Sequence, residues 1–379
     1  MMGPVRRLDS LAAGPADDTD FDDSNPFESM TQAVYRSEQA DAPPAFIDIP
    51  LVVDANCDGF RLDRFLTARI RRLSRTRIAS IIAAGAVSSP DRPGTSLRAG
   101  TRVRLGQLVV LRRPAPVEPP APMHADVLHR DDDLLVLDKP AGLTVHPSAR
   151  YHRHTLTAVL RAALGPDHGW EMAHRLDRET SGVIVFGRHG RSASALKRAF
   201  QGRQVDKQYL ALVRGELTGA ARIDVPLGPA IDSRVRIKMG PRALAQGGMI
   251  ARTDVEPIAA GRFRDEPITL VRARPRTGRQ HQIRVHLAEL GHPVLGDKLY
   301  GIDEQAFLDV VDHGRLMDDL AGDLGLARQA LHAWSLALPH PEHGGTVSFT
   351  APWPSELAAI LPLPPRAAAA AEPPRPPTP

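Results

Sequence analysis

The sequence predicts an α+β protein in which a large domain with a mixed, mainly antiparallel sheet and flanking helices follows a small unit of helices and strands. Three observations support this prediction. After residue 126, strand and helix patterns follow one another irregularly, without the strict alternation of parallel α/β folds. A proline-dense stretch, 114–125, precedes this region and separates it from a compact segment, 46–113. The apolar content of 42% is sufficient for sizeable cores, so we expect folded domains at 46–113 and 126–352.

Both ends of the chain have compositions that disfavour folding. Residues 1–45 carry three basic and nine acidic side chains without apolar periodicity, which predicts a disordered acidic tail. Residues 353–379 are expected to form a low-complexity Pro/Ala tail. The sequence contains no membrane-length apolar run and no signal-peptide pattern, so we expect a cytoplasmic protein without a membrane span. The single cysteine, Cys57, excludes a disulfide framework.

The small segment begins with an extended stretch, 46–53. Apolar residues in 62–73 then recur at helical spacing. Ser74 is a suitable N-cap for a second helix, and Gly85 suits its end. The apolar residues of 103–111 predict strands, which completes a small unit of two helices and a few strands.

The charge of this segment indicates a polyanionic partner. Residues 56–113 contain thirteen arginines, three aspartates and no lysine. The planar guanidinium group binds phosphate oxygens in a bidentate manner, so this composition favours nucleic acid. A solvated charged face is the alternative. Our candidates for phosphate contacts are Arg71, Arg72, Arg75 and Arg77.

In the large domain, the spacing of apolar residues predicts both strands and helices. We expect strands at Leu134–Leu137, Val183–Phe186, Tyr209–Val213 and Ile268–Ala273, and helices at Thr155–Ala163, Ser192–Gln201 and Gln280–Leu290.

One run in this domain has the pattern of a reactive carboxylate. The sequence HRLDRETSG (174–182) places Asp177 between Arg175 and Arg178, just before an apolar strand. Neighbouring cations keep a carboxylate ionised when burial would protonate it. An ionised, desolvated carboxylate acts as a nucleophile or stabilises charge. A structural ion-pair network has the same pattern, so the run alone leaves both interpretations open.

The run HRLDRETSGVIVFG resembles the catalytic motif of the RluA/RluD-type pseudouridine synthases. Stretches that resemble other motifs of this family occur in the same order, namely LDKPAGLTVHP (137–147), KQYLALV (207–213), RTGRQHQIRVHL (276–287) with GHPVLGD (291–297), and QALHA (329–333). The resemblance covers roughly 126–350 and implies a pseudouridine synthase catalytic domain. The reaction is an isomerisation, so we expect no cofactor.

The resemblance also implies roles for individual residues. Asp177 would be the catalytic aspartate, and Tyr209 would pack against the target base and assist removal of its carbon-5 proton. Arg284 would pair with Asp177. Independently of the family, a cation near a helix start is disfavoured by the helix dipole, which indicates a compensating anion, either RNA phosphate or Asp177. Leu331 would form an apolar wall under the base, although an ordinary core leucine fits equally well.

A carboxylate that engages a stacked base requires the target uridine to be flipped out or to lie in a loop. Arg175 and Arg178 are candidates for filling the vacated stack or binding phosphates, with scaffold salt bridges as the alternative. Arg279 and His146 are further candidates for RNA contacts.

The basic segment resembles the alpha-L (ribosomal protein S-four-like) RNA-binding module in RLDRFL (61–66), LSRTRI (73–78) and GAV (85–87). It departs from that module at 88–90, where SSP replaces the usual asparagine. The module favours large-subunit ribosomal RNA as the substrate, with transfer RNA as the alternative.

Two other classes of function remain to be separated from a synthase. One is a non-catalytic RNA-binding or ribosome-assembly factor, and the other is an N-glycosidase that releases the base.

His152 and His154 lack further ligands at metal spacing, so we expect no metal site. We expect a monomer whose partner is RNA.

Overall fold

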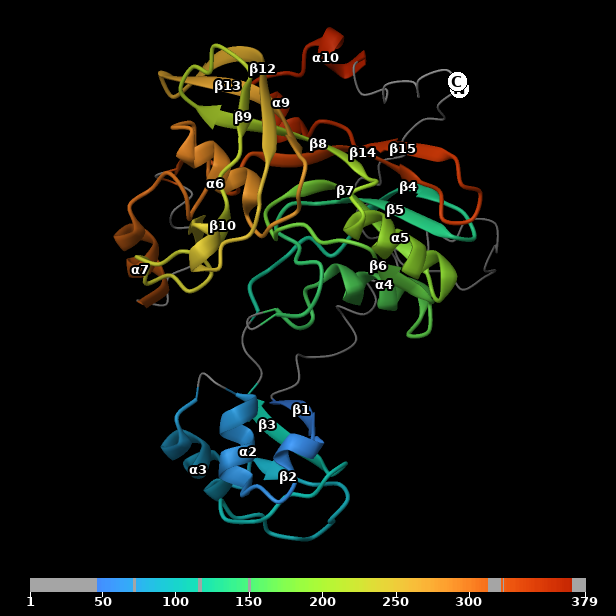
Figure 1. Cartoon of the computed structure of the whole chain (residues 1–379), viewed down its shortest axis with the longest axis vertical. Helices are drawn as coiled ribbons and strands as arrows, with labels where there is room; N and C mark the ends of the chain where they lie inside the picture. Colours follow the sequence, from blue (N-terminus) through green and yellow to red (C-terminus); the bar gives the residue numbers. More distant parts are fainter. Residues whose placement is uncertain are drawn as a thin grey trace, which may run out of the picture. The chain divides into compact units, whose positions relative to one another are not determined.

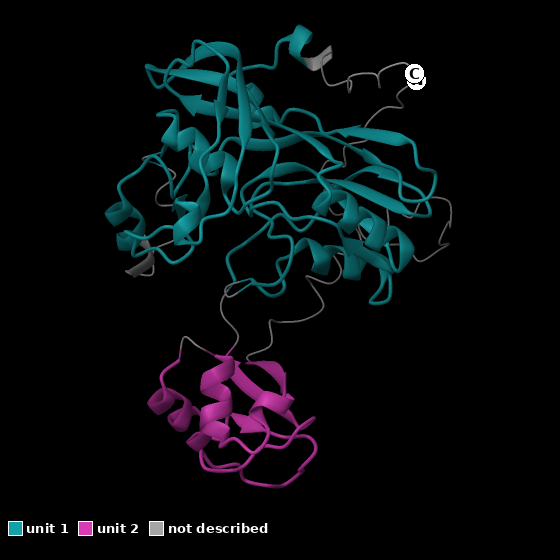
Figure 2. Ribbon diagram, viewed as in Figure 1, with its two compact units in different colours: residues 1–34, 118–379 teal, residues 35–117 magenta. Residues whose placement is uncertain are grey.

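The computed structural model describes residues 46–70, 73–114, 118–148, 151–312, 322 and 324–369, which form two compact units (Figure 2). The smaller unit spans 46–114 and the larger one begins at residue 118. The predicted acidic tail, 1–45, lies outside the described residues. None of the helices in the described ranges combines the length and apolar content that a membrane span requires.

The smaller unit is a three-stranded antiparallel sheet packed against two helices (Figure 1). Its elements are β1 (Phe46–Val52), η1 (Ala55–Cys57), α2 (Leu62–Arg69), α3 (Arg75–Ala83), β2 (Val87–Ser88) and β3 (Leu108–Pro114). Ser74 caps α3 as predicted, because its side chain accepts a hydrogen bond from the Arg77 amide. The predicted strand around Val103 is wrong: Val103 is buried in a loop, and a turn from Arg104 to Gln107 delays the strand to Leu108.

The larger unit is built on a ten-stranded sheet (Figure 1). Along its main path the strands are β4 (Asp126–Arg130), β5 (Leu134–Lys139), β7 (Ser181–Arg188), β14 (Leu331–Pro339), β8 (Asp206–Arg214), β13 (Glu266–Pro275), β12 (Thr253–Phe263) and β9 (Ala221–Ile223). β6 (Trp170–Met172) pairs with β7, and β15 (Thr346–Thr350) pairs with β14. β7 and β14 are parallel and the other pairs are antiparallel, which confirms the predicted mixed sheet.

Helices cover both faces of the β5–β7 region. Alternate residues of β5 point to opposite faces. Leu135 and Leu137 pack with α4 (Leu156–Leu164), whereas Leu134 and Val136 pack with α5 (Arg191–Gln201). The remaining elements of this unit are β10 (Leu227–Pro229), β11 (Met239–Pro241), η2 (Leu244–Gln246), α6 (Gln282–Glu289), α7 (Glu304–Asp312), α9 (Ser355–Ala358) and α10 (Pro365–Ala369).

The predicted linker at 114–125 is largely part of the larger unit. The Glu118 carboxylate accepts hydrogen bonds from the backbone amides of His152, Arg153 and His154. Apolar side chains at 121, 123 and 125 pack against the core beside α4. These contacts anchor the segment from residue 118, although its proline content resembles that of a free linker.

The predicted boundary at residue 352 is also too early. Leu357 is fully buried, and Trp353 and Leu361 pack against the core formed by β8 and β13. The Trp353 indole donates a hydrogen bond to the Leu361 carbonyl at 3.1 Å. The folded domain therefore continues through at least Leu363, which packs against the same core.

The parallel pairing of β7 and β14 depends on Gly182. This residue has φ +109°, and a Cβ atom at this position would lie 2.1 Å from the Ala333 carbonyl oxygen. Gly182 therefore allows the two strands to approach each other directly after the loop that carries Asp177.

We predict that Gly182→Ala lowers the free energy of unfolding by at least about 2 kcal/mol, because the methyl group meets backbone atoms that cannot rotate away. Gly247→Ala is the matched control. Gly247 is also left-handed, with φ +86°, but it has open space around it, so a loss of about 1 kcal/mol is expected. Urea denaturation measures both variants, and equal losses would contradict the close-approach argument.

Candidate active site

Asp177 lies on the loop between β6 and β7, and backbone contacts fix this loop at both ends. The amide of Ala173 donates to the Val185 carbonyl, and the Val185 amide donates to His174 Nε2, each at 3.1 Å. Burial lowers the pKa of His174 to about 3, so its ring remains a neutral acceptor. The Thr180 amide closes the loop on the Asp177 carbonyl.

A buried lysine holds the middle of the loop. Lys139 Nζ donates hydrogen bonds to the carbonyls of Pro140, Leu143 and Arg178 at 2.7, 2.8 and 3.1 Å. Burial lowers the pKa of Lys139 to about 7, while three carbonyl acceptors match the three donors of an ammonium group. The Gly142 amide also donates to the Arg178 carbonyl. The segment 139–143 therefore supports the residue next to Asp177.

The far side of the loop is fixed by Glu179. Its carboxylate accepts hydrogen bonds from Arg178, Lys298 and the Gln329 amide. The Gln329 side chain donates to the Thr180 hydroxyl at 2.7 Å. These contacts tie the loop to the segment that enters β14.

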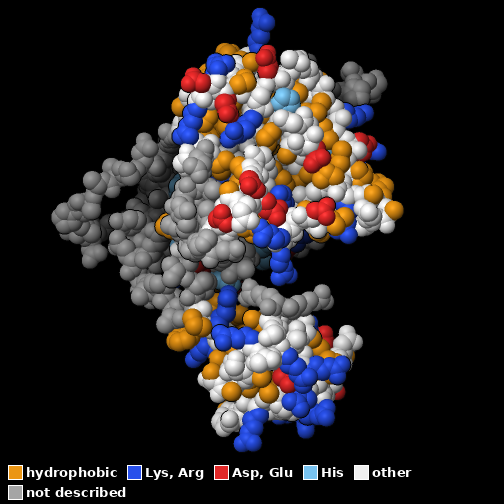
Figure 3. Space-filling model, turned by 90° about the vertical axis from the view of Figure 1, so that its left-hand side faces the viewer, with side chains coloured by type: hydrophobic (Ala, Val, Ile, Leu, Met, Phe, Trp, Pro, Cys, Tyr) orange, Lys and Arg blue, Asp and Glu red, His pale blue; other side chains and the backbone are white. Residues whose placement is uncertain are grey.

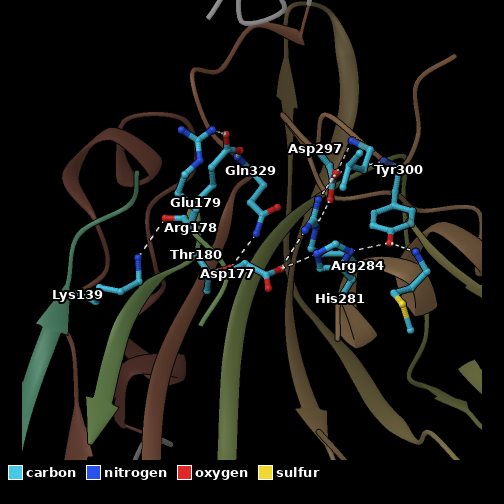
Figure 4. A network of polar contacts seen from close by, with 12 residues as sticks. Lys139, Asp177, Arg178, Glu179, Thr180, His281, Arg284, Asp297, Tyr300 and Gln329 are labelled. Carbon is cyan, nitrogen blue, oxygen red and sulfur yellow. Dashed lines mark hydrogen bonds and ion pairs between the residues drawn. The ribbon is translucent and has the colours of Figure 1, made fainter. Parts of the chain in front are cut away.

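Arg284 bridges two carboxylates at the centre of the site (Figure 4). Its Nη1 donates to Asp177 Oδ2 at 2.9 Å. Its Nε and Nη2 form a bidentate pair with Asp297 at 2.6 and 2.8 Å. Asp297 Oδ1 also accepts the backbone amides of Leu299 and Tyr300. The Arg284 side chain is 6% exposed and that of Asp297 is fully buried, so this pair is a rigid support for Asp177.

These contacts determine the charge of Asp177. Burial alone would raise its pKa, but nearby positive charge, above all that of Arg284, outweighs this effect and holds the pKa below its usual value. Burial also opposes the charged form of Arg284, but Asp297 and Asp177 raise its pKa. Both side chains therefore remain charged at neutral pH. The sequence predicted an anion beside the cation near the start of α6. Arg284 is that cation, and two carboxylates contact it, those of Asp177 and Asp297.

Asp177 opens into a cavity of about 1400 Å³. Tyr209 and Leu331 line the cavity together with Asp177. Burial, followed by the Asp177 charge, raises the pKa of the Tyr209 hydroxyl, which keeps it protonated at neutral pH. The cations that line the cavity are Arg175, Arg203, Lys207, Arg274, Arg276, Arg279 and Arg284. The cavity therefore combines a carboxylate, apolar walls and a basic lining, which suits a base attached to a phosphate backbone.

The structure brings together most of the residues that the sequence singled out in this domain. Asp177, Tyr209, Arg284 and Leu331 line one cavity, together with Arg175 and Arg279. Arg175 is exposed, and no ion pair holds it within the described part of the chain.

Two candidates lie elsewhere. Arg178 is held by the Tyr151 hydroxyl at 2.8 Å and by Glu179 at 2.7 Å, as in the scaffold alternative. Neither Arg178 nor His146 is among the described residues that line the cavity.

Sequence reasoning did not assign roles to four important groups: Lys139, Asp297, His281 and Tyr300. Lys139, Asp297 and His281 fall within the quoted motifs, but their contacts join positions far apart in the sequence. Membership of the motifs could have indicated that these three residues are functional, whereas their spacing along the chain could not. Among the described residues, no group of three or more His, Cys, Asp or Glu side chains is placed to hold a metal ion.

The arginines of the smaller unit divide into paired and free groups (Figure 3 shows several basic side chains on one face of this unit). Arg75 is bound to the buried carboxylate of Asp63 at 3.0 Å. Arg77 is exposed and has no ion pair within the described ranges. Arg71 and Arg72 lie outside the described residues.

We predict that Lys139→Met lowers the free energy of unfolding by about 2 to 4 kcal/mol, because three carbonyls in a buried site lose the ammonium donor, and only that of Arg178 keeps another, the Gly142 amide. Lys197→Met is the control. Lys197 forms an exposed ion pair with Glu171, and its loss should change stability by less than about 0.5 kcal/mol. Denaturant titration compares the variants, and a small effect at Lys139 would refute its role as a loop support.

Known proteins resemble the chain over both the sequence and the fold. The RNA pseudouridylate synthase family model matches residues 133–289. The ribosomal large subunit pseudouridine synthase D of Nitrosomonas europaea is 33% identical over 322 residues, covering 83% of this chain and 87% of that protein. The Xanthomonas campestris protein of the same name is 36% identical over 319 residues, covering 82% and 90%. A structure of human RNA pseudouridylate synthase domain containing 1 covers 64% of this chain and 89% of its own, with 27% identity and a TM-score of 0.50. The chain therefore belongs to the RluA/RluD-type family of RNA pseudouridine synthases.

Proposed function

We propose that this enzyme converts specific uridines to pseudouridine in large-subunit ribosomal RNA, with Asp177 as the catalytic carboxylate. The observation that carries the proposal is the Asp177–Arg284 contact of 2.9 Å within a cavity lined by cations. It supplies an ionised carboxylate where a flipped nucleotide would enter. The names of the relatives from Nitrosomonas and Xanthomonas support ribosomal RNA as the substrate class.

The reaction exchanges one bond to the ribose for another. The bond between N1 of uracil and C1′ breaks, the detached base rotates, and C5 forms a bond to C1′. The hydrogen on C5 leaves as a proton, and N1 gains a proton, so the product is an isomer of the substrate. Asp177 engages the target nucleotide while the base is detached, and the cavity walls at Tyr209 and Leu331 retain the base.

Tyr209 serves as a wall for the base in this scheme. Burial and the Asp177 charge raise its pKa, so the hydroxyl is protonated at neutral pH in the free protein. Its predicted part in removing the carbon-5 proton stays a prediction. Arg175 is free to enter the stack that the flipped uridine vacates or to bind a phosphate. Arg279 lines the same cavity and is a second candidate for phosphate contact.

A non-catalytic RNA-binding factor would have no need of an ionised carboxylate supported by a buried arginine. Keeping Arg284 and Asp297 desolvated carries a cost that a purely structural site avoids with apolar residues. The presence of Asp177, Tyr209 and Arg284 in one cavity therefore favours turnover. Transfer RNA remains the alternative substrate, and direct comparison decides between the two.

Tritium release tests the activity. We expect transcribed large-subunit ribosomal RNA labelled with tritium at uridine C5 to lose tritium to water, and Asp177→Asn to abolish the release while RNA binding persists. Labelled transfer RNA is the parallel substrate. Release from transfer RNA alone would show that transfer RNA, and not ribosomal RNA, is the substrate. The absence of release from both RNAs would overturn the proposed activity. Free uracil in solution would indicate a glycosidase.

The smaller unit is proposed to be the alpha-L RNA-binding module that brings ribosomal RNA to the active site. We predict that Arg77→Ala weakens RNA binding and lowers the slope of log affinity against log salt by about one unit, since one phosphate contact is lost. Arg112→Ala is the control: the Arg112 guanidinium is already paired with Asp48 at 2.7 Å, so we expect a smaller change in the slope. Filter binding across a salt series measures both, and an unchanged slope for Arg77→Ala would exclude this contact.

A further inference from the structure

His281 lies between Asp177 and a buried tyrosine (Figure 4). Its Nε2 is 3.9 Å from Asp177 Oδ2, and its Nδ1 is 2.8 Å from the Tyr300 hydroxyl. The His281 side chain is 9% exposed and lines the active-site cavity. It directly precedes α6 and has φ +55°, a left-handed conformation that few non-glycine residues adopt. Such strain at a cavity wall suggests a constraint set by function.

The partners of Tyr300 determine which ring nitrogen of His281 carries the proton. The Tyr300 hydroxyl accepts a hydrogen bond from the Met239 amide at 3.0 Å. Its one proton therefore needs an acceptor, and His281 Nδ1 is the partner within reach. The opposite tautomer would leave the proton of a buried hydroxyl without an acceptor among the described residues, which is unfavourable. Nδ1 thus accepts, and Nε2 carries the hydrogen that faces Asp177.

We propose that His281 is a positioning residue for Asp177, donating from Nε2 to Asp177 Oδ2 when the target nucleotide is bound. The proposal rests on the proposed function, because it assigns a second support to the same carboxylate. The 3.9 Å separation is beyond hydrogen-bond length in the free protein. Contacts in active sites commonly shorten when the substrate is bound, and a small rotation of the carboxylate closes this one.

This arrangement distinguishes the two oxygens of Asp177. Arg284 donates to Oδ2 at 2.9 Å, and His281 faces the same oxygen. No hydrogen bond to Oδ1 is present within the described residues. Two donors on Oδ2 would fix the plane of the carboxylate and leave Oδ1 to face the nucleotide.

A neutral donor suits this position. Burial, together with the charge of Arg284, lowers the pKa of His281 to about 4, although Asp177 and Asp297 oppose this shift. The Nε2 hydrogen is therefore present without protonation of the ring. It steers Asp177 without neutralising the carboxylate, whereas a second full cation beside Arg284 would be repelled.

Paired substitutions separate positioning from a structural role. His281→Gln retains an amide donor near the place of Nε2, whereas His281→Asn is too short to reach Asp177. Asparagine tolerates the left-handed backbone better than glutamine does. We expect kcat to fall about 10- to 100-fold in His281→Asn and less in His281→Gln, with KM for RNA unchanged in both. We expect the melting temperature to follow the opposite order.

The result that would overturn the proposal is equally specific. If His281→Asn retains kcat within about twofold of the wild type, or if both variants lose kcat in step with melting temperature, His281 does not position Asp177. A wild-type protein that releases no tritium from any RNA would instead refute the proposed function. The two failures are therefore distinguishable.

A spectroscopic measurement tests the tautomer without reference to turnover. In ¹H–¹⁵N spectra of imidazole groups, assigned by comparison with His281→Gln, we expect Nε2 of His281 to be protonated and Nδ1 to be unprotonated. Tyr300→Phe removes the hydroxyl that donates to Nδ1 and should produce a mixture of tautomers with a smaller loss of kcat than His281→Asn. Protonation of Nδ1 in the wild type would contradict the inference.

Discussion

The active site depends on the buried guanidinium of Arg284. A desolvated cation of this kind is stable only with charged, well-oriented acceptors, and Asp297 supplies them through a bidentate pair. Asp297 is itself oriented by two backbone amides. Because Asp297 fixes its Nε and Nη2 donors, Arg284 presents Nη1 to Asp177 from a defined position. The carboxylate is therefore ionised and located by the same contact, and the loop supports at Lys139 and Glu179 bring it to that position.

Much of the larger domain was predictable because its elements have apolar patterns of sufficient length. The strands expected near 134, 183, 209 and 268 and the helices expected near 155, 192 and 280 all occur, with ends shifted by a few residues. Errors arose where composition and packing disagree. Residues 118–125 and 353–363 are rich in proline, which is typical of linkers and tails, but a few apolar side chains and Glu118 anchor them to the core. Composition describes the average of a segment, whereas anchoring depends on single side chains and distant partners.

The site shows the same limit in a sharper form. Asp177 and Arg284 were identified through motifs, and the dipole argument correctly required an anion near the start of α6. The argument could not identify Asp297 as the main partner, because that contact depends on the turn into 299–300. The sequence likewise could not predict that His281 is a hydrogen-bond donor, because Tyr300 and the Met239 amide, which lie on other elements, determine its tautomer. Local sequence could predict which residues belong to the site. The orientation of their side chains arises from contacts between segments that lie far apart in the chain.

The two arginines beside Asp177 show how one short motif serves two purposes. Arg178 is held by Tyr151 and Glu179, so its charge is used within the scaffold. Arg175 points into the cavity without an ion pair in the described ranges, so its charge is available to a ligand. Arg284, another cation of the lining, is shared between Asp177 and the buried Asp297. Under the proposed function, the basic lining would attract the phosphates of the RNA. Such an attraction would orient the nucleotide toward the single carboxylate of Asp177 before any chemistry begins.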